Sequence, residues 1–182
     1  MLESANLSIL LAFYAFATTN VFFSDLAIFF AEWFPFLVIG SVVVYEVFSR
    51  DNEHEIIPSI IRTLLPALLA WFVVVLIKYA YPVGRPFTGD LGVVSLVSVD
   101  DPFGSFPSGH ATAFGALAGA MLGNKFHAWK WYLLAAVIIA IARVAVGVHW
   151  PVDVIVGLGF GFFIGFFVAR PLQMMSHGKT KA

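Results

Sequence analysis

The chain alternates long apolar stretches with short polar breaks, a pattern typical of helical membrane proteins. The clearest apolar stretches cover residues 25–48, 57–80, 109–123, 129–148 and 151–169. Because a helix that crosses a bilayer needs roughly 20 mostly apolar residues, each stretch is interpreted as a span, although the one at 109–123 is short. The pattern therefore predicts an all-α, polytopic membrane helix bundle.

A sixth apolar stretch, residues 5–22, is shorter, and its far end carries the polar residues Thr18, Thr19 and Asn20. It lacks the basic start and the small-residue cleavage site of a signal peptide. Two placements stay open for it: it either spans the membrane or lies in the interface as an anchor. We count it as the first of six helices and treat residues 1–182 as one integral membrane domain.

The composition supports lipid as the solvent of this chain. Of its 182 residues, 60% are hydrophobic and 12% are charged, whereas soluble domains are nearer half apolar and a quarter charged. The formal net charge of −1 argues against nucleic acid as a partner, since that needs a basic surface. With no cysteine in the sequence, disulfides and thiolate catalysis are excluded.

Basic residues set the predicted orientation. Seven of them lie near the second–third connection, the fourth–fifth connection or the C-terminus, which six spans place on one side: Arg50, Arg62, Lys125, Lys130, Arg170, Lys179 and Lys181. By the positive-inside rule that side is cytoplasmic. We therefore predict a cell (inner) membrane protein with a cytoplasmic C-terminus, and a cytoplasmic N-terminus if residues 5–22 span. The loop 81–108 and the corner 148–152 then face outward, and the acidic run 51–55 is interpreted as a solvated loop.

Glycines recur every four residues in two of the predicted helices. They are Gly115, Gly119 and Gly123 in the first, and Gly157, Gly161 and Gly165 in the second. Small residues at this spacing let helix backbones approach closely in membranes. We predict that both faces pack helices together and take no part in chemistry.

Two cations break the charge bias on the outer side. Lys78 ends one span, and Arg85 follows in "KYAYPVGRPF", beyond the helix-breaking Pro82 and Gly84. Taken alone, they suit a snorkelling lysine and a loop arginine. Their position against the overall bias makes them candidates for binding an anion.

The stretch "FPSGHAT" marks a helix start beside a histidine. Ser108 is a plausible N-cap, which leaves the amides of Gly109 and His110 without partners in the first turn. Gly109 allows a ligand to approach the backbone closely, and a helix N-terminus is an anion site. The alternative is a plain helix cap whose histidine faces water.

The third polar stretch is "ARVAVGVHWPVDV". Arg143 lies within a span, where an unpaired guanidinium is costly and usually functional. His149 precedes Pro151, which suits the first turn of a helix, and Asp153 then falls within reach of the His149 ring. A carboxylate on one ring nitrogen fixes the tautomer and frees the other nitrogen as a nucleophile or base. The alternative is an ion pair that closes a helix corner.

All three stretches lie at outer helix ends, so together they supply three cations, a helix N-terminus, two histidines and one carboxylate. This set suits a phosphate group, which arginine binds bidentately and lysine binds as a point charge. No cluster of carboxylate or Cys/His ligands in the sequence suggests a metal.

These blocks resemble the signature of the type-2 phosphatidic acid phosphatase superfamily, which also contains bacterial acid phosphatases and vanadium haloperoxidases. The family pattern is Lys, six residues, Arg-Pro; then Pro-Ser-Gly-His; then Ser-Arg, five residues, His, three residues, Asp. This chain has Lys78…Arg85-Pro86, Pro107-Ser108-Gly109-His110 and Ala142-Arg143…His149…Asp153, and the resemblance covers about residues 24–170. Ala142 stands where the family usually has Ser, which removes a hydroxyl but no charged or imidazole group.

The resemblance implies a role for each residue. His149 attacks phosphorus and forms a phosphohistidine, Asp153 holds its ring, and His110 protonates the leaving oxygen and then activates water. The non-bridging oxygens are held by Lys78, Arg85, Arg143, Ser108 and the amides near Gly109. The family needs no metal or cofactor for hydrolysis.

The resemblance also suggests the substrate, a membrane lipid phosphate hydrolysed at the outer face. The small chain is similar to undecaprenyl-pyrophosphatase members that recycle the carrier lipid of cell-wall synthesis, and the alternative is a phosphatidylglycerophosphate or phosphatidate phosphatase. A non-catalytic phospholipid binder or transporter is the alternative from another functional class. The oligomeric state, and the way loop 87–106 shapes lipid entry, do not follow from the sequence.

Overall fold

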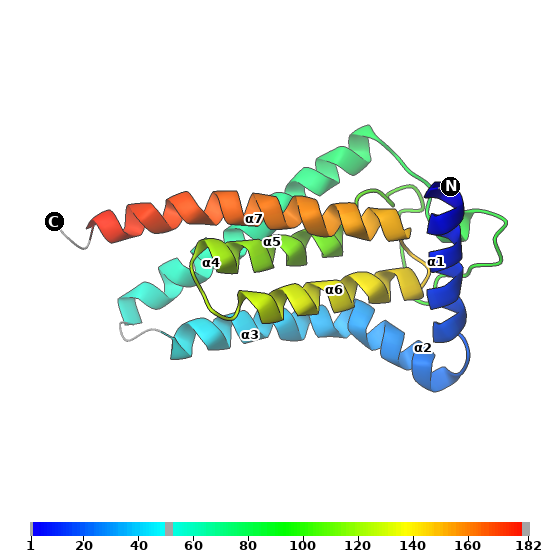
Figure 1. The fold of residues 1–182 in the computed structure, drawn as a ribbon, viewed down its shortest axis with the longest axis horizontal. Coiled ribbons are helices and arrows are strands. Elements are labelled where there is room, and N and C mark those ends of the chain that lie inside the picture. The colour runs from blue at the N-terminus through cyan, green and yellow to red at the C-terminus, as the bar shows by residue number, and fades with distance from the viewer. Residues whose placement is uncertain (1, 50–52, 180–182) are drawn as a thin grey trace.

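The computed structural model describes residues 2–49 and 53–179. The helices are α1 (Leu2–Ala17), α2 (Val21–Ile28), a π-helical turn η1 (Phe29–Trp33), α3 (Phe34–Phe48), α4 (Glu53–Ala80), a short 3₁₀ turn η2 (Pro86–Thr88), α5 (Gly109–Gly123), α6 (Trp129–Ala145) and α7 (Pro151–Lys179). Since α2, η1 and α3 form one continuous segment, the described part of the chain has six helical segments besides the turn η2 (Figure 1). The predicted all-α membrane bundle is confirmed. Of the predicted basic residues, Arg50 and Lys181 lie outside the described residues.

The first helix does not run with the bundle. Figure 1 shows α1 crossing the end of the molecule at which α6 ends and α7 begins. Among the described residues, three helical stretches are long and apolar enough to cross a membrane, Val21–Phe48, Glu53–Ala80 and Pro151–Leu172, whereas α1 is a shorter apolar helix. The arrangement favours the interfacial placement of residues 5–22, and the cytoplasmic N-terminus, which required a span there, stays a prediction.

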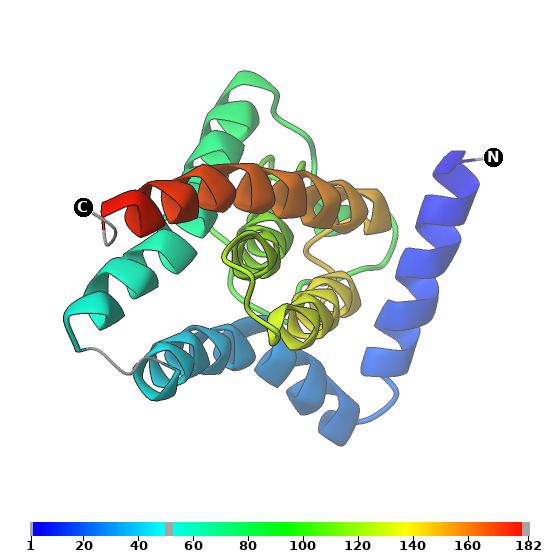
Figure 2. The same ribbon diagram turned by 60° about the vertical axis from the view of Figure 1, so that its left-hand side comes forward.

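The short helix α5 is the centre of the bundle. Figure 2 shows it surrounded by α3, α4, α6 and α7, and twelve of its 15 residues are buried. Its sequence, "GHATAFGALAGAMLG", is rich in alanine and glycine because it packs against protein on nearly every side. A helix enclosed in this way does not need the length or hydrophobicity of a lipid-facing one.

Several helix ends differ from the predicted bounds, among them the start of α4 and the end of α6. The acidic residues Glu53 and Glu55 lie in the first turn of α4, where negatively charged side chains stabilise the helix N-terminus. The interpretation of that part of the acidic run as loop was wrong. Helix α6 ends at Ala145, before the predicted residue 148, because Gly147 has a φ of +78°. Glycine adopts this left-handed conformation without strain.

The two glycine faces pack helices, as predicted, and the structure shows that they pack α5 against α7. A Cβ atom on Gly119 would overlap the carbonyl of Phe162, and one on Gly161 would overlap the carbonyl of Thr112. The contacts alternate between the helices, so each glycine admits the backbone of the other helix. This close packing fixes the start of α5 beside the start of α7.

We expect Gly161→Ala to destabilise the protein strongly. The new methyl group overlaps backbone rather than a movable side chain, and overpacking of this kind costs about 1–3 kcal/mol or more. Gly159→Ala is the matched control, because a Cβ there meets nothing within 4 Å. Thermal unfolding in detergent measures both variants. Equal melting temperatures for the two would contradict this account of the packing.

Candidate active site

The loop after α4 folds back on itself and forms the floor of the site. Val83 pairs with Gly104 in an isolated parallel bridge, with the Val83 amide donating to the Phe103 carbonyl at 2.6 Å and the Ser105 amide donating to Val83 at 3.0 Å. The indole Nε1 of Trp150 donates to the carbonyl of Gly84 at 3.0 Å. The first and third sequence blocks are therefore held against each other.

Arg85 lies at the centre of this floor, where backbone carbonyls fix its side chain. The residue is only 7% exposed. Its Nε donates to the carbonyl of Asp101 at 2.7 Å, and its Nη1 donates to the carbonyl of Val148 at 2.9 Å. The same Nη1 lies 3.4 Å from Nε2 of His149. This places a permanent cation beside the ring nitrogen that would carry a phosphoryl group.

The opposite ring nitrogen of His149 faces Asp153. Nδ1 lies 3.5 Å from Oδ2 of Asp153, and both side chains are 2% exposed. That oxygen also accepts hydrogen bonds from Oγ of Ser105 at 2.5 Å and from the amide of Trp150 at 2.9 Å. Catalytic hydrogen bonds are often long without substrate and tighten when it binds. The carboxylate is thus oriented by two donors and stands next to the imidazole.

Sequence reasoning missed Ser105. Its side chain is fully buried, and it lies at the beginning of the stretch that contains His110. The signal was weak, since a loop serine three residues before an N-cap has no distinctive pattern.

Burial lowers the pKa of His149 from 6.5 to about 4. Asp153 opposes the shift, while Arg143, Arg85 and Lys78 reinforce it with their positive charges. The ring is therefore neutral at pH 7, as a nucleophile must be.

We expect the acid limb of kcat/KM to lie well below pH 6.5. Protonation of His149 abolishes its attack on phosphorus, and because the pKa of His149 is lowered to about 4, that protonation takes place only at low pH. A pH–rate profile with an aryl phosphate, corrected for the second ionisation of the phosphate at about pH 6, measures the limb. A limb at the ordinary histidine value would contradict the assigned environment.

The start of α5 is the helix end that was predicted to bind an anion. Ser108 is the N-cap, and its Oγ accepts from the amide of Ala111 at 3.5 Å. The Ser108 amide donates to the carbonyl of Asp153 at 3.1 Å, which ties this helix end to the start of α7. His110 stands in the first turn, partly exposed, within electrostatic reach of His149 and Arg143.

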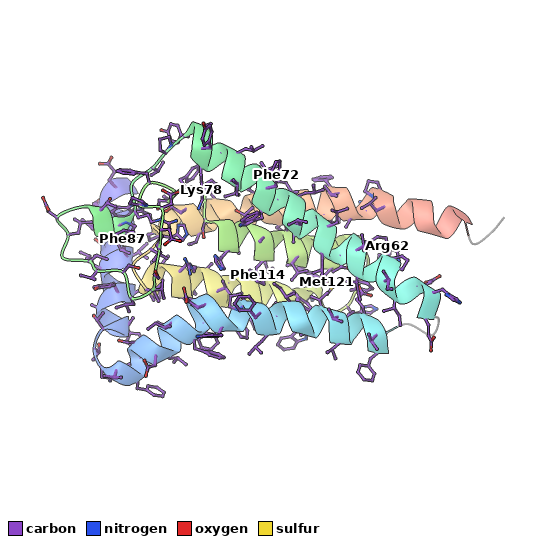
Figure 3. All side chains as sticks on the ribbon, turned by 180° about the vertical axis from the view of Figure 1, so that it is seen from behind. Arg62, Phe72, Lys78, Phe87, Phe114 and Met121 are labelled. Carbon is purple, nitrogen blue, oxygen red and sulfur yellow. The ribbon has the colours of Figure 1, made fainter. Side chains whose placement is uncertain are left out.

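Lys78 lies at the loop end of α4, and Arg62 lies towards its other end (Figure 3). A Cβ built on Gly104 would be 3.5 Å from Cδ of Lys78 and would overlap the carboxylate of Asp101. Asp101 was interpreted as a solvated loop charge, and it is exposed. Its carbonyl nevertheless holds Arg85, and its carboxylate faces the lysine side of the site.

Arg143 approaches the site from α6 and is 7% exposed. Its Nη1 donates to the carbonyl of Ala31 at 3.4 Å and lies 3.9 Å from Oε1 of Glu32. The sequence analysis did not single out Glu32, although an acidic residue inside an apolar stretch is a recognisable signal. Ala142 is buried in a small apolar cluster with Ala31 and Val146.

The arrangement suits phosphoryl transfer. Three cations and a helix N-terminus surround a neutral imidazole, and positioning plus charge stabilisation are what this chemistry needs from a protein. Among the side chains that the structure describes, those of residues 3–49 and 53–172, no three His, Cys, Asp or Glu gather closely enough to hold a metal ion.

Comparison with known proteins identifies the family. A family model described as the PAP2 superfamily matches residues 8–175. YbjG of Escherichia coli (strain K12), whose name gives it provisionally as an undecaprenyl-diphosphatase, is 32% identical over 179 residues, which cover 97% of this chain and 87% of that protein. The lipid A 1-phosphatase of Rhizobium johnstonii is 37% identical over 99 residues, covering 52% of this chain and 40% of that protein.

A solved structure shares the fold. The crystal structure of Aquifex aeolicus LpxE superposes with a TM-score of 0.63 at 25% identity, covering 87% of this chain and 93% of that chain. The resemblance carried by the three sequence blocks is thereby confirmed: the chain belongs to the PAP2 superfamily and is a membrane phosphatase.

Proposed function

We propose that this protein is a metal-independent lipid phosphatase that works through a phosphohistidine at His149. The observation that carries the proposal is the placement of one buried imidazole, with Nδ1 facing Asp153 at 3.5 Å and Nε2 facing the guanidinium of Arg85 at 3.4 Å. An imidazole that is neutral, oriented on one side and flanked by a cation on the other is arranged to attack phosphorus.

In the first step the lone pair of His149 Nε2 attacks phosphorus, and the bond from phosphorus to the leaving oxygen breaks. His110 gives its proton to that oxygen, and Asp153 stabilises the positive charge that develops on the His149 ring. In the second step the now neutral His110 takes a proton from water as the water attacks phosphorus. The N–P bond then breaks, and free phosphate and the starting enzyme are restored.

The cations hold the non-bridging oxygens during both steps. Arg85 approaches from the loop, Arg143 from α6 and Lys78 from α4, while Ser108 and the amides near Gly109 approach from the start of α5. Charge spreads over these oxygens in the transition state, so fixed donors stabilise it more than the ground state.

An apolar groove next to the site supports a lipid substrate. The groove has a volume of about 490 Å³ and is lined only by apolar and aromatic residues of α3, α4 and α5, among them Leu64, Trp71 and Phe114. Trp71 also lies beside Gly109, where a built Cβ would be 3.5 Å from its ring. A lipid tail in the groove would therefore extend from a headgroup held at the start of α5.

Among lipid phosphates, undecaprenyl pyrophosphate is the substrate we favour. The relative that matches nearly the whole chain carries that activity in its name. Phosphatidylglycerophosphate or phosphatidate is the alternative, and the lipid A phosphatase name of a shorter match adds a further phosphorylated lipid.

We propose that the site faces the outside of the cell membrane and that the C-terminus is cytoplasmic. Of the basic residues used for the orientation, Arg62 lies towards the end of α4 opposite Lys78 (Figure 3). Lys125 lies in the turn between α5 and α6, and Lys130 lies in the first turn of α6, also opposite the site. An impermeant label on a C-terminal tag in intact cells tests this topology. We expect no labelling, and labelling of the tag would show that the C-terminus lies outside the cell.

Phosphate release from a panel of lipids tests the function. Detergent-purified protein is supplied, in the presence of chelator, with undecaprenyl pyrophosphate, phosphatidylglycerol phosphate, phosphatidate and lipid A. We expect release that survives chelation and is greatest for undecaprenyl pyrophosphate. Another ranking would replace the substrate. No release from any lipid by protein that still binds vanadate would favour the binder or transporter instead.

A further inference from the structure

The first long helical segment contains a break that faces the site. The turn η1, Phe29–Trp33, is π-helical, and the amide of Phe34 donates to the carbonyl of Phe29 five residues earlier. Within the regular helix that follows, the carbonyl of Ala31 would accept from residue 35, but residue 35 is proline and has no N–H. The sequence "AEWFP" therefore frees one backbone acceptor inside a membrane-spanning segment.

Arg143 uses that acceptor. Its Nη1 donates to the Ala31 carbonyl at 3.4 Å, and the carboxylate of Glu32 lies 3.9 Å from the same nitrogen. Ala31 is fully buried and packs in one apolar cluster with Ala142. Two adjacent residues of η1 thus contact the same end of one guanidinium.

The Nε edge of the Arg143 guanidinium has no such contact. Its Nε is buried, and no hydrogen-bond partner for it exists among the described residues. A guanidinium is a planar fork of donors, so holding the Nη1 end also sets the direction of the Nε edge. A buried donor without a partner costs free energy unless a ligand satisfies it.

The positive charges around Arg143 give a second reason to assign a role to Glu32. Arg143 and Arg85 are near enough for their charges to repel each other, and both belong to a site that contains a third cation, Lys78. Glu32, 41% exposed on its side chain, sits in an apolar span where a carboxylate is costly and usually has a specific partner. Glu32 offsets the positive charge at Arg143, as Asp101 and Asp153 do at Lys78 and Arg85.

We propose that Glu32 is a positioning residue of the phosphate site: with the freed carbonyl of Ala31 it anchors the Nη1 end of Arg143 and directs the Nε edge towards a phosphoryl oxygen. The proposal rests on the proposed function in that the anion is the phosphoryl group of the substrate. Glu32 touches neither the substrate nor the reacting atoms, and it acts through Arg143.

The first test compares Glu32→Ala and Glu32→Gln with Asp25→Asn. Asp25 is an exposed acidic residue of α2, in the same segment and away from Arg143, so it controls for loss of a negative charge near the outer end. Equilibrium binding of orthovanadate is measured first, and kcat and KM for a lipid phosphate second. We expect Glu32→Ala to weaken vanadate binding and kcat/KM roughly tenfold. Glu32→Gln should lose less, and the control should match the wild type.

The second test addresses the carbonyl. Pro35→Ala restores an N–H that can return the Ala31 carbonyl to the helix, in competition with Arg143. Alanine is also the better helix former, so we expect the melting temperature to be maintained or raised while vanadate binding weakens. A purely structural role for Pro35 would move stability and binding together in the same direction.

The outcomes separate the two proposals. Wild-type binding of vanadate with unchanged binding in both Glu32 variants would overturn the positioning role, whatever the enzyme hydrolyses. Weakened binding in those variants, with no phosphate released by the wild type from any lipid, would support the positioning role and reject the phosphatase. Wild-type protein that binds no vanadate would overturn both.

Discussion

His149→Ala is expected to lower turnover by about 10⁴-fold or more, because the variant has no nucleophile and the remaining groups only bind and polarise the substrate. Lys78, Arg85 and Arg143 are unchanged in this variant. Its affinity for inorganic phosphate should therefore stay within several-fold of the wild type, and this separation of binding from turnover is the sign of a lost nucleophile. Phosphate release from substrate and binding of inorganic phosphate are measured on the same preparation.

His127→Ala is the matched control for that variant. His127 is exposed in the turn between α5 and α6, at the end of the bundle opposite the site, and its loss should leave turnover unchanged. If His149→Ala kept wild-type rates, the covalent mechanism would be wrong. If it lost binding of inorganic phosphate and also melted at a much lower temperature, the residue would be structural.

His110→Ala is expected to cost about 10²- to 10⁴-fold on a lipid phosphate, the usual contribution of a general acid or base. The loss should depend on the leaving group. The alkoxide that leaves a lipid phosphomonoester such as phosphatidate needs a proton as it departs, whereas a nitrophenolate departs without one. With nitrophenyl phosphate the variant should still form the phosphoenzyme and release a burst of nitrophenol, followed by slow turnover, because activation of water also needs His110.

Rapid-mixing kinetics with both substrates measure this difference. A burst with the aryl phosphate and none with the lipid would place His110 at the leaving oxygen and at the water. Equal losses in the first step for both substrates would contradict the acid role and leave His110 as a binding group.

Local rules were enough to predict much of the site. Ser108 as an N-cap, Pro151 in a first helical turn, and the approach of His149 to Asp153 all follow from residues close in sequence. The alternation of apolar and polar segments also predicted the order of the helices. The glycine spacing predicted that α5 and α7 each have a close-packing face, because a four-residue period defines one face of a helix, but it did not predict that the two faces meet each other.

Residues whose role depends on distant contacts were missed. Ser105 donates to Asp153 across 48 positions, and Arg143 meets the carbonyl of Ala31 across 112 positions. No pattern near Ser105 or Glu32 reveals the partner. The angle of α1 was left open for the same reason. Among its tertiary contacts are those of Tyr14, which accepts from the amide of Val94, and Asn6, which accepts from that of Val152.

Trapping the phosphoenzyme tests the central claim most directly. Wild-type protein is mixed with substrate labelled with ³²P in the transferred phosphate, quenched in alkali during turnover, digested and mapped by mass spectrometry, with His149→Ala in parallel. The mechanism predicts label that is stable to alkali and lost in acid, as for a phosphorus–nitrogen bond, located on the peptide that contains His149 and absent from the variant. Turnover without such label, or label on another residue, would contradict it.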